Sequence, residues 1–135
     1  MLLRDSKRLN HRFVDRPAVT YTLVQARVGG EPLGLAVLRD NSLCEWVVPP
    51  ERVDVAGALV AWCDEYVRAS HSSPLASPLE TSFPETCPEW LLFQRLGFRI
   101  QGGHDYTCFR SFHKPYVMSW LFHHWYYTPS DLGQI

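Results

Sequence analysis

Two adjacent histidines near the carboxyl terminus are the first residues whose types suggest chemistry, because imidazole is a common metal ligand. They are His123 and His124. Side chains of neighbouring residues point to opposite faces of a strand and diverge by about 100° on a helix, so this pair would rarely bind one ion. No cysteine or carboxylate stands at a ligand spacing from them. The sequence therefore predicts no metal site.

Serine and cysteine, the usual nucleophiles of covalent catalysis, do not stand in a catalytic pattern. The chain has no G-x-S-x-G elbow, and Ser72, Ser73 and Ser130 lie in turn contexts. The four cysteines are widely spaced, and Cys44 and Cys63 fall in apolar patterns, where a reduced thiol packs as a small hydrophobic side chain. We expect reduced core cysteines, with disulfides as the alternative.

Three strands form the part of the chain that must position any site. Residues 20–28, 33–39 and 43–48 are rich in strand-forming side chains. The segments between them, Gly29-Gly30 and Asp40-Asn41-Ser42, have turn chemistry, because glycine accepts a positive φ and short polar side chains bond to nearby backbone. These patterns predict three antiparallel strands in a meander.

A long amphipathic helix is predicted next, over residues 54–69. Pro49-Pro50 ends the third strand because proline supplies no N–H to the ladder, and Asp54 is placed to cap the helix. Apolar side chains then recur at helical spacing, and this stripe is predicted to face the sheet. Its members are Val55, Leu59, Trp62, Cys63, Tyr66 and Val67.

Two shorter helices are predicted, over residues 4–12 and 88–96. The second has Thr86 as its expected N-cap and Gly97 as a left-handed cap. The tail over residues 116–128 is unusually aromatic and is expected to pack against the domain.

Further strands are predicted over residues 79–83, 98–101 and 106–112. The predicted fold class is therefore α/β (α+β), in a single domain over residues 1–135. Its centre is a mostly antiparallel mixed sheet of six or seven strands, with one long helix and one or two short helices. Three meander strands before the long helix argue against a doubly wound parallel sheet.

Composition disfavours two classes of function. A formal net charge of −1 and a pI near 6.6 leave no basic footprint for nucleic acid. The amino terminus lacks the apolar core of a signal peptide, and no stretch approaches the roughly 18 apolar residues of a membrane span. We therefore expect a cytoplasmic protein that binds neither nucleic acid nor membrane.

Residues in the second short helix and in the tail resemble one enzyme superfamily. The segment Phe93-Gln94-Arg95-Leu96-Gly97-Phe98 resembles the helix end common in the GNAT superfamily of acyl-CoA-dependent N-acyltransferases. Residues 8–21 and the tail over residues 125–132 are similar to a bacterial GNAT-like subgroup. The resemblance covers residues 5–132, and it implies the carboxyl-terminal part of a GNAT domain without its first strand and first helix.

The resemblance also implies where acyl-CoA would bind. In GNAT enzymes the pyrophosphate lies on backbone N–H groups between the fourth strand and the long helix, in a Q/R-x-x-G-x-G/A loop where the helix dipole also favours anions. The positions that correspond here are Arg52, Val53 and Asp54 at the helix start. Val47 and Val48 at the strand end are also expected to contact the acyl-CoA, with backbone amides near Val47 holding the thioester oxygen.

That loop departs from the family pattern in this chain. Pro49 and Pro50 remove backbone donors, Glu51 and Asp54 add negative charge where phosphates would lie, and no glycine precedes the helix. Arg52 offsets part of this charge. The alternative is a capped helix start that binds no cofactor.

The resemblance assigns the general base to Glu45, on the strand where many family members carry a catalytic glutamate. A carboxylate beside a cleft can have its pKa raised toward neutrality by desolvation, which suits a base. The alternative is a polar residue on the outward face of the strand. Phe93 stands where many members have a tyrosine acid, and phenylalanine cannot donate a proton, so Tyr66, Tyr106 or water would have to replace it.

Two classes of function follow. The first is an N-acyltransferase that moves an acyl group from acyl-CoA, such as acetyl-CoA, to a small-molecule amine, with the acyl-CoA between the strand ending at Val48 and the strand over residues 79–83. The second is a catalytically inactive GNAT-like module for binding or dimerisation. Because the first strand and helix of the family have no counterpart, one sheet edge or face is expected to lack its cover. We expect a homodimer, or a missing amino-terminal half-domain, to supply it.

Overall fold

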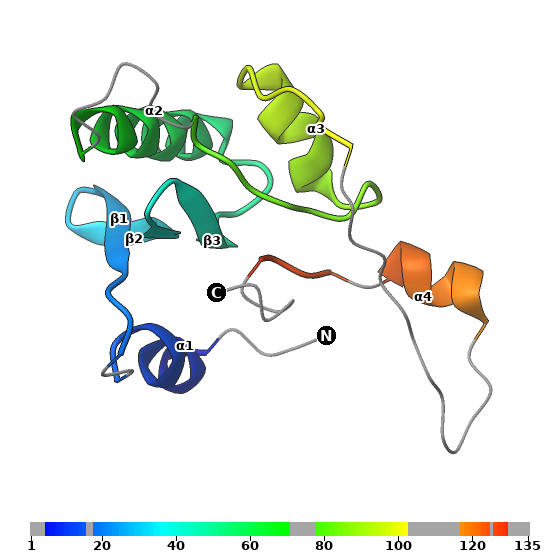
Figure 1. The fold of residues 1–135 in the computed structure, drawn as a ribbon, viewed down its shortest axis with the longest axis horizontal. Coiled ribbons are helices and arrows are strands. Elements are labelled where there is room, and N and C mark those ends of the chain that lie inside the picture. Colours follow the sequence, from blue (N-terminus) through cyan, green and yellow to red (C-terminus); the bar gives the residue numbers. More distant parts are fainter. Residues whose placement is uncertain (1–4, 16–17, 71–77, 103–116, 125, 130–135) are drawn as a thin grey trace.

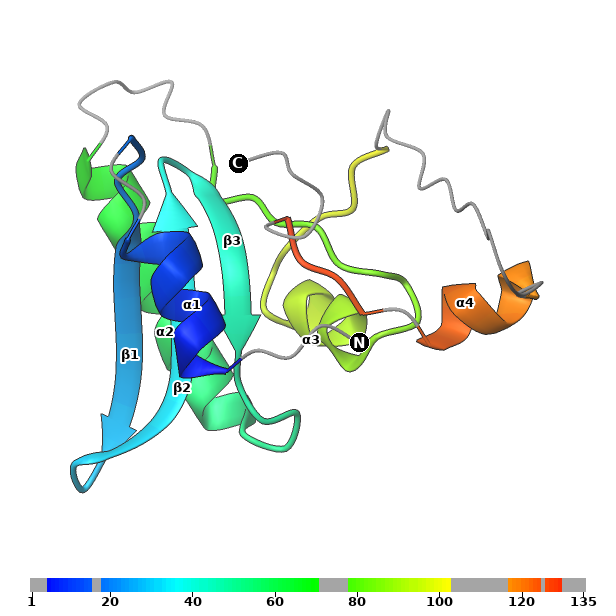
Figure 2. The ribbon, with the colours of Figure 1, turned by 90° about the horizontal axis from the view of Figure 1, so that it is seen from below.

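The computed structural model describes residues 5–15, 18–70, 78–102, 117–124 and 126–129. A long helix covers one face of a three-stranded sheet, and a short amino-terminal helix lies against the other face (Figure 1; Figure 2). None of the described helices is long and apolar enough to cross a bilayer. In chain order the elements are α1 (Ser6–Phe13), β1 (Thr22–Val28), β2 (Glu31–Arg39), β3 (Ser42–Val47), α2 (Val53–Ser70), α3 (Pro88–Arg95) and α4 (Met118–His124).

The predicted meander is confirmed. The strands pair antiparallel in the order β1-β2-β3. Both turns use the residues that the sequence singles out: Gly29 and Gly30 have φ of 58° and 91°, and Asp40 has φ of 54°. This left-handed region is the one that glycine and short polar residues tolerate best. The local turn chemistry therefore sets the two hairpins.

The predicted GNAT-like sheet of six or seven strands is wrong for the part of the chain that the structure describes, where the sheet has three strands. Residues 79–83 form a single isolated parallel bridge to the start of β3. Residues 98–101 are not a strand, and Ile100 is exposed. Strand-forming side chains stabilise a strand mainly through neighbours across a ladder, and neither segment has a described ladder. The strand predicted over residues 106–112 lies outside the described residues.

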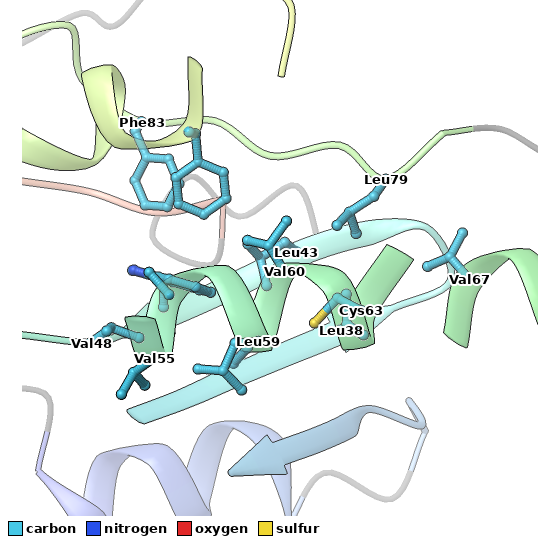
Figure 3. Close-up of a cluster of buried hydrophobic side chains, with 14 residues drawn as sticks. Leu38, Leu43, Val48, Val55, Leu59, Val60, Cys63, Val67, Leu79 and Phe83 are labelled. Carbon is cyan, nitrogen blue, oxygen red and sulfur yellow. The ribbon is translucent and has the colours of Figure 1, made fainter. Parts of the chain in front are cut away.

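The long helix is confirmed as α2, but its buried face differs from the predicted one. Trp62 and Tyr66 are 42% and 37% exposed, and Ala56 and Val60 are buried in their place. α3 packs beside α2 and shifts the buried face toward itself (Figure 1). Figure 3 shows the cluster that α2 covers. Its buried members are Ala36, Leu38, Leu43, Trp46, Val48, Val55, Ala56, Leu59, Val60, Cys63, Val67, Leu79, Phe83 and Phe93.

A smaller cluster lies between α1 and the opposite face of the sheet. Phe13, at the end of α1, clusters with Cys44 of β3, and its ring meets Tyr21 edge-on with the centroids 5.1 Å apart. Asp5 caps the helix start by accepting a hydrogen bond from Arg8 N–H at 2.8 Å. The prediction of a short helix that docks through a few apolar anchors is confirmed.

The end of α3 has the geometry that its sequence predicts. Phe98 N–H donates to Phe93 O at 3.0 Å, and Gly97 N–H donates to Gln94 O at 3.1 Å, with φ of 98° at Gly97. These two bonds form a Schellman motif. The rings of Phe93 and Phe98, with centroids 4.9 Å apart, make the apolar contact that accompanies it. The left-handed cap at Gly97 is confirmed.

Both predicted N-caps are wrong. α2 begins at Val53, so Asp54 lies inside its first turn. The N-cap residue of α3 is Cys87 rather than Thr86, and the Cys87 side chain makes no capping hydrogen bond. Pro88 follows in the first turn of α3, where its missing N–H removes one of the donors that a cap would satisfy. α2 therefore begins one residue before its predicted cap, and the N-cap of α3 lies one residue after the predicted one.

The described cysteines are free thiols. Cys44 and Cys63 are buried, as their apolar patterns predict, and burial raises the pKa of Cys44 to about 11 and that of Cys63 to about 12. Burial also raises the pKa of the half-buried Cys87 to about 11. All three thiols are therefore protonated at neutral pH and are weak nucleophiles. Cys108 lies outside the described residues.

Gly34→Ala tests the close contact between β2 and α2. A Cβ atom on Gly34 would lie 2.9 Å from Val55 Cγ1, 3.0 Å from Leu59 Cδ1 and 3.1 Å from Val48 Cγ2, which is closer than packed carbon atoms approach. We expect the substitution to lower the free energy of unfolding by about 1–3 kcal/mol. Urea titration followed by circular dichroism measures this change.

Gly57→Ala is the matched control. A Cβ atom on Gly57 would lie 3.8 Å from Leu96 Cδ2, an ordinary contact, in the interior of a helix, where alanine is favoured over glycine. We expect this variant to be as stable as the native chain or more stable by about 0.5–1 kcal/mol. Equal destabilisation by the two substitutions would contradict the close packing of α2 on Gly34.

Candidate functional site

β3 and the segment that precedes α3 begin side by side and parallel, and then separate. Leu43 N–H donates to Glu80 O at 2.8 Å, and Glu80 N–H donates to the turn before β3 at 2.9 Å. The Thr81 hydroxyl donates to Leu43 O at 3.1 Å. Beyond these bonds, no described backbone hydrogen bond joins the two segments. We call the region where residues 43–48 diverge from residues 80–83 the splay. The sequence analysis predicts that acyl-CoA binds there.

A β-bulge in β3 places Glu45 at the splay. The register with β2 shifts between Val37 and Leu38, so Cys44 is an extra residue and Glu45 lies opposite Val37. The Glu45 side chain is 2% exposed, and its Oε1 accepts a hydrogen bond from Trp46 N–H at 3.2 Å. Glu45 is therefore not the solvent-facing residue of the alternative interpretation. It is a buried carboxylate that contacts a main-chain amide.

The amide that points into the splay belongs to Trp46. Its N–H donates to the Glu45 carboxylate, which we interpret as an N–H directed away from β2. Because N–H groups alternate in direction along a strand, the Val47 N–H then points toward Leu35 of β2. Val47 is half-buried and Val48 lies in the core. The structure thus brings Glu45 together with Trp46, a residue that sequence reasoning missed because the bulge has no clear sequence signal.

The start of α2 contains an internal ion pair. Arg52 Nε and Nη2 donate to Asp54 Oδ1 and Oδ2 at 2.9 and 2.6 Å. These bonds, with help from the Val55 backbone N–H, lower the pKa of Asp54 to about 2, and they raise the pKa of Arg52. Arg52 N–H donates to Pro49 O at 2.9 Å, and Val53 is exposed. A pyrophosphate would therefore have to displace an ionised carboxylate to reach this helix start.

Aromatic rings occupy the space between β3 and α3. Phe93 is buried, and its ring centroid lies 4.9 to 5.0 Å from those of Trp46, Phe83 and Phe98. Tyr126, in the tail, lies beside Phe83 with the centroids 6.3 Å apart. The indole Nε1 of Trp46 is buried without a hydrogen-bond partner. Phe93 is thus a core side chain at the centre of an aromatic cluster.

The candidate tyrosine acids lie in different parts of the chain. Tyr66 OH is hydrogen-bonded to Thr22 Oγ1 at 3.0 Å, beside β1 and at the opposite edge of the sheet from the splay. Tyr106 lies outside the described residues. The Tyr126 ring reaches the aromatic cluster at the splay, and the sequence analysis did not name this residue as a candidate acid. The aromatic density of the tail was the signal that pointed to this segment.

His123 and His124 each contact the backbone of α4. Their Nδ1 atoms lie 2.6 Å from Ser119 O and 2.7 Å from Trp120 O, one turn earlier in the helix. The Trp120 ring also stacks on His124, with the centroids 4.4 Å apart. Among the described residues, no group of three or more histidine, cysteine, aspartate or glutamate side chains is placed to hold a metal ion.

Comparison with known proteins adds no relative. No family model matches the chain, and no curated protein or solved structure matches it. The GNAT resemblance therefore stays a prediction from sequence motifs.

Asp54→Asn tests the ion pair at the start of α2. The folded-state pKa of Asp54 is lowered from 3.8 to about 2, so its ionised form stabilises the fold above pH 3.8, and this contribution is lost as the pH falls to about 2. We expect the variant to have a lower Tm than the native chain at neutral pH and an equal Tm near pH 2. Thermal denaturation followed by circular dichroism across this range measures the difference.

Glu51→Gln is the control, because it removes a neighbouring carboxylate that affects Arg52 only through its charge. Its Tm should differ less from that of the native chain at neutral pH. A deficit of Asp54→Asn that persists unchanged near pH 2 would contradict the ion pair as its cause.

Proposed function

We propose that this protein is an acyl-CoA-dependent N-acyltransferase resembling those of the GNAT superfamily, with its reaction at the splay. The observation that supports this is the buried Glu45 carboxylate 3.2 Å from the outward N–H of Trp46, where β3 separates from residues 80–83. Acyl transfer from a thioester to an amine needs both kinds of group. A fixed N–H stabilises the carbonyl oxygen as charge develops, and a carboxylate takes the proton of the amine.

In this proposal, the thioester carbonyl oxygen of acetyl-CoA accepts the Trp46 N–H after Glu45 releases it. The Glu45 carboxylate removes a proton from the incoming ammonium group, and the amine nitrogen attacks the carbonyl carbon. The C–N bond forms while negative charge moves to the oxygen, where one such donor contributes about 3 kcal/mol. The C–S bond then breaks as the nitrogen gives its second proton to water, which leaves the neutral amide, and the thiolate takes a proton from Tyr126 or from water.

A second function, a catalytically inactive module for binding or dimerisation, is favoured by the start of α2. Asp54 holds negative charge where the pyrophosphate would bind, and Arg52 is already paired with it. Phe93 has no proton to donate to a thiolate. In this alternative, the bond between Glu45 and Trp46 satisfies an amide that the divergence of β3 leaves unpaired.

We also propose a cytoplasmic location. Cys44, Cys63 and Cys87 are free thiols, and a reducing compartment keeps such thiols unpaired. Cell fractionation followed by immunoblotting would test this location, and recovery of the protein outside the cytoplasmic fraction would contradict it.

Isothermal titration with acetyl-CoA and a longer acyl-CoA tests the acyltransferase. We expect the native chain to bind acetyl-CoA and to release free CoA thiol when a primary amine is added. Glu45→Gln keeps a side-chain oxygen for the Trp46 N–H but cannot take up a proton. We expect its turnover to fall by about 10²–10⁴-fold while its affinity for acetyl-CoA is kept.

The double variant Glu51→Gly with Asp54→Asn separates cofactor affinity from catalysis. It removes two negative charges and frees the start of α2, so acetyl-CoA should bind it more tightly than the native chain if this loop faces the phosphates. Absence of acetyl-CoA binding in both the native chain and this variant would exclude the acyltransferase and leave the inactive module.

A further inference from the structure

β1 is an edge strand of the sheet in the part of the chain that the structure describes, and exposed aromatic side chains lie beside it. It pairs with β2 alone, and within the described residues no backbone hydrogen bond satisfies its other edge. The rings of Trp62 and Tyr66 on α2 stack with their centroids 5.1 Å apart, and Tyr66 is tied to Thr22 of β1. Both rings are exposed. An unpaired edge flanked by fixed, exposed aromatic rings is a surface for association.

The sequence of β1 lacks the features that keep natural strand edges from pairing. It has no proline and no lysine, and Arg27 is its one charged residue. The register shift with β2 leaves Leu33 of β2 as the extra residue, so β1 itself stays regular. Leu23 and Val28 are exposed apolar side chains. β1 can therefore accept another strand without rearrangement.

The pairing of β1 with β2 determines which main-chain N–H groups of β1 point away from the sheet. These groups belong to alternate residues. Because the Trp46 N–H points away from β2, its partner Ala36 directs its own N–H and C=O toward β1. Val24 faces Ala36 and exchanges both hydrogen bonds with it. The amides of the residues on either side, Leu23 and Gln25, therefore point outward from the sheet.

We propose that two copies of this chain pair antiparallel along β1, about a two-fold axis at Gln25. In this register the two Gln25 residues exchange both main-chain hydrogen bonds. Val24 lies opposite Ala26 of the second copy, and Leu23 lies opposite Arg27 of the second copy.

The strand is complementary to itself in this arrangement. Arg27, the charged residue of each β1 strand, lies opposite an uncharged residue of the other copy. Its aliphatic stem covers the exposed Leu23 of that copy. The contact uses the same surface on both copies, so it closes at a dimer, in which two three-stranded sheets become one continuous sheet. This self-complementarity favours a second copy over an unrelated strand, and the dimer does not depend on acyl transfer.

Sedimentation equilibrium at micromolar concentration tests the pairing. We expect the native chain to have twice the mass of 15.6 kDa. Gln25→Pro removes an outward N–H and leaves the ladder with β2 intact, because proline is tolerated on the outer side of an edge strand. It should be a folded monomer by circular dichroism. Gln25→Thr keeps the N–H and, as the matched control, should stay dimeric.

Each of three results would overturn the proposal. One is a native chain of 15.6 kDa at every concentration, and another is a folded Gln25→Pro variant that remains dimeric. The third is a mixed complex with a different protein in place of the dimer.

A charge exchange tests the same register if Gln25→Pro does not fold. Leu23→Lys places a positive charge opposite Arg27 of the second copy and should give a monomer, since like charges directly opposite destabilise strand pairing. Adding Arg27→Glu puts opposite charges at both positions and should restore the dimer. A dimer in Leu23→Lys, or a folded double variant that stays monomeric, would exclude pairing about Gln25.

Discussion

The packing of α2 on the sheet at Gly34 is the contact on which the rest of the described structure depends. Because Gly34 has no side chain, Val55 and Leu59 of α2 approach the backbone of β2 closely. This approach sets the distance between helix and sheet, and it leaves Trp46 and Val48 without access to water. Full burial of one aliphatic side chain contributes about 1.5–3 kcal/mol, more than a typical net hydrogen bond, so this layer dominates the stability of the domain.

The bulge in β3 decides which of its side chains pack on each face of the sheet. Trp46 packs under α2, whereas Cys44 packs with Phe13 under α1. On its outer edge, β3 is bonded to the neighbouring segment only as far as Leu43. The Glu45 carboxylate satisfies the Trp46 N–H, which would otherwise cost about 1–3 kcal/mol as an unpaired buried group.

The motif behind the family resemblance has a structural cause that does not require any activity. Gly97 and Phe98 close α3 with a Schellman motif, and Phe93 makes its apolar contact. Many helices end in this way, so the motif predicts the helix end more firmly than it predicts acyl transfer. Support for the chemistry comes instead from Glu45 and Trp46, which that motif does not include.

The sequence by itself determined the elements that depend on a few neighbouring residues: the Gly29-Gly30 turn, the helical repeat of α2 and the left-handed end of α3. It also indicated Glu45 as a candidate base. Only the tertiary structure decided that Glu45 is buried, and that residues 98–101 form no strand. Burial and strand pairing are contacts between segments distant in the chain, and a one-residue bulge changes which side chains face each other, so local patterns cannot specify them.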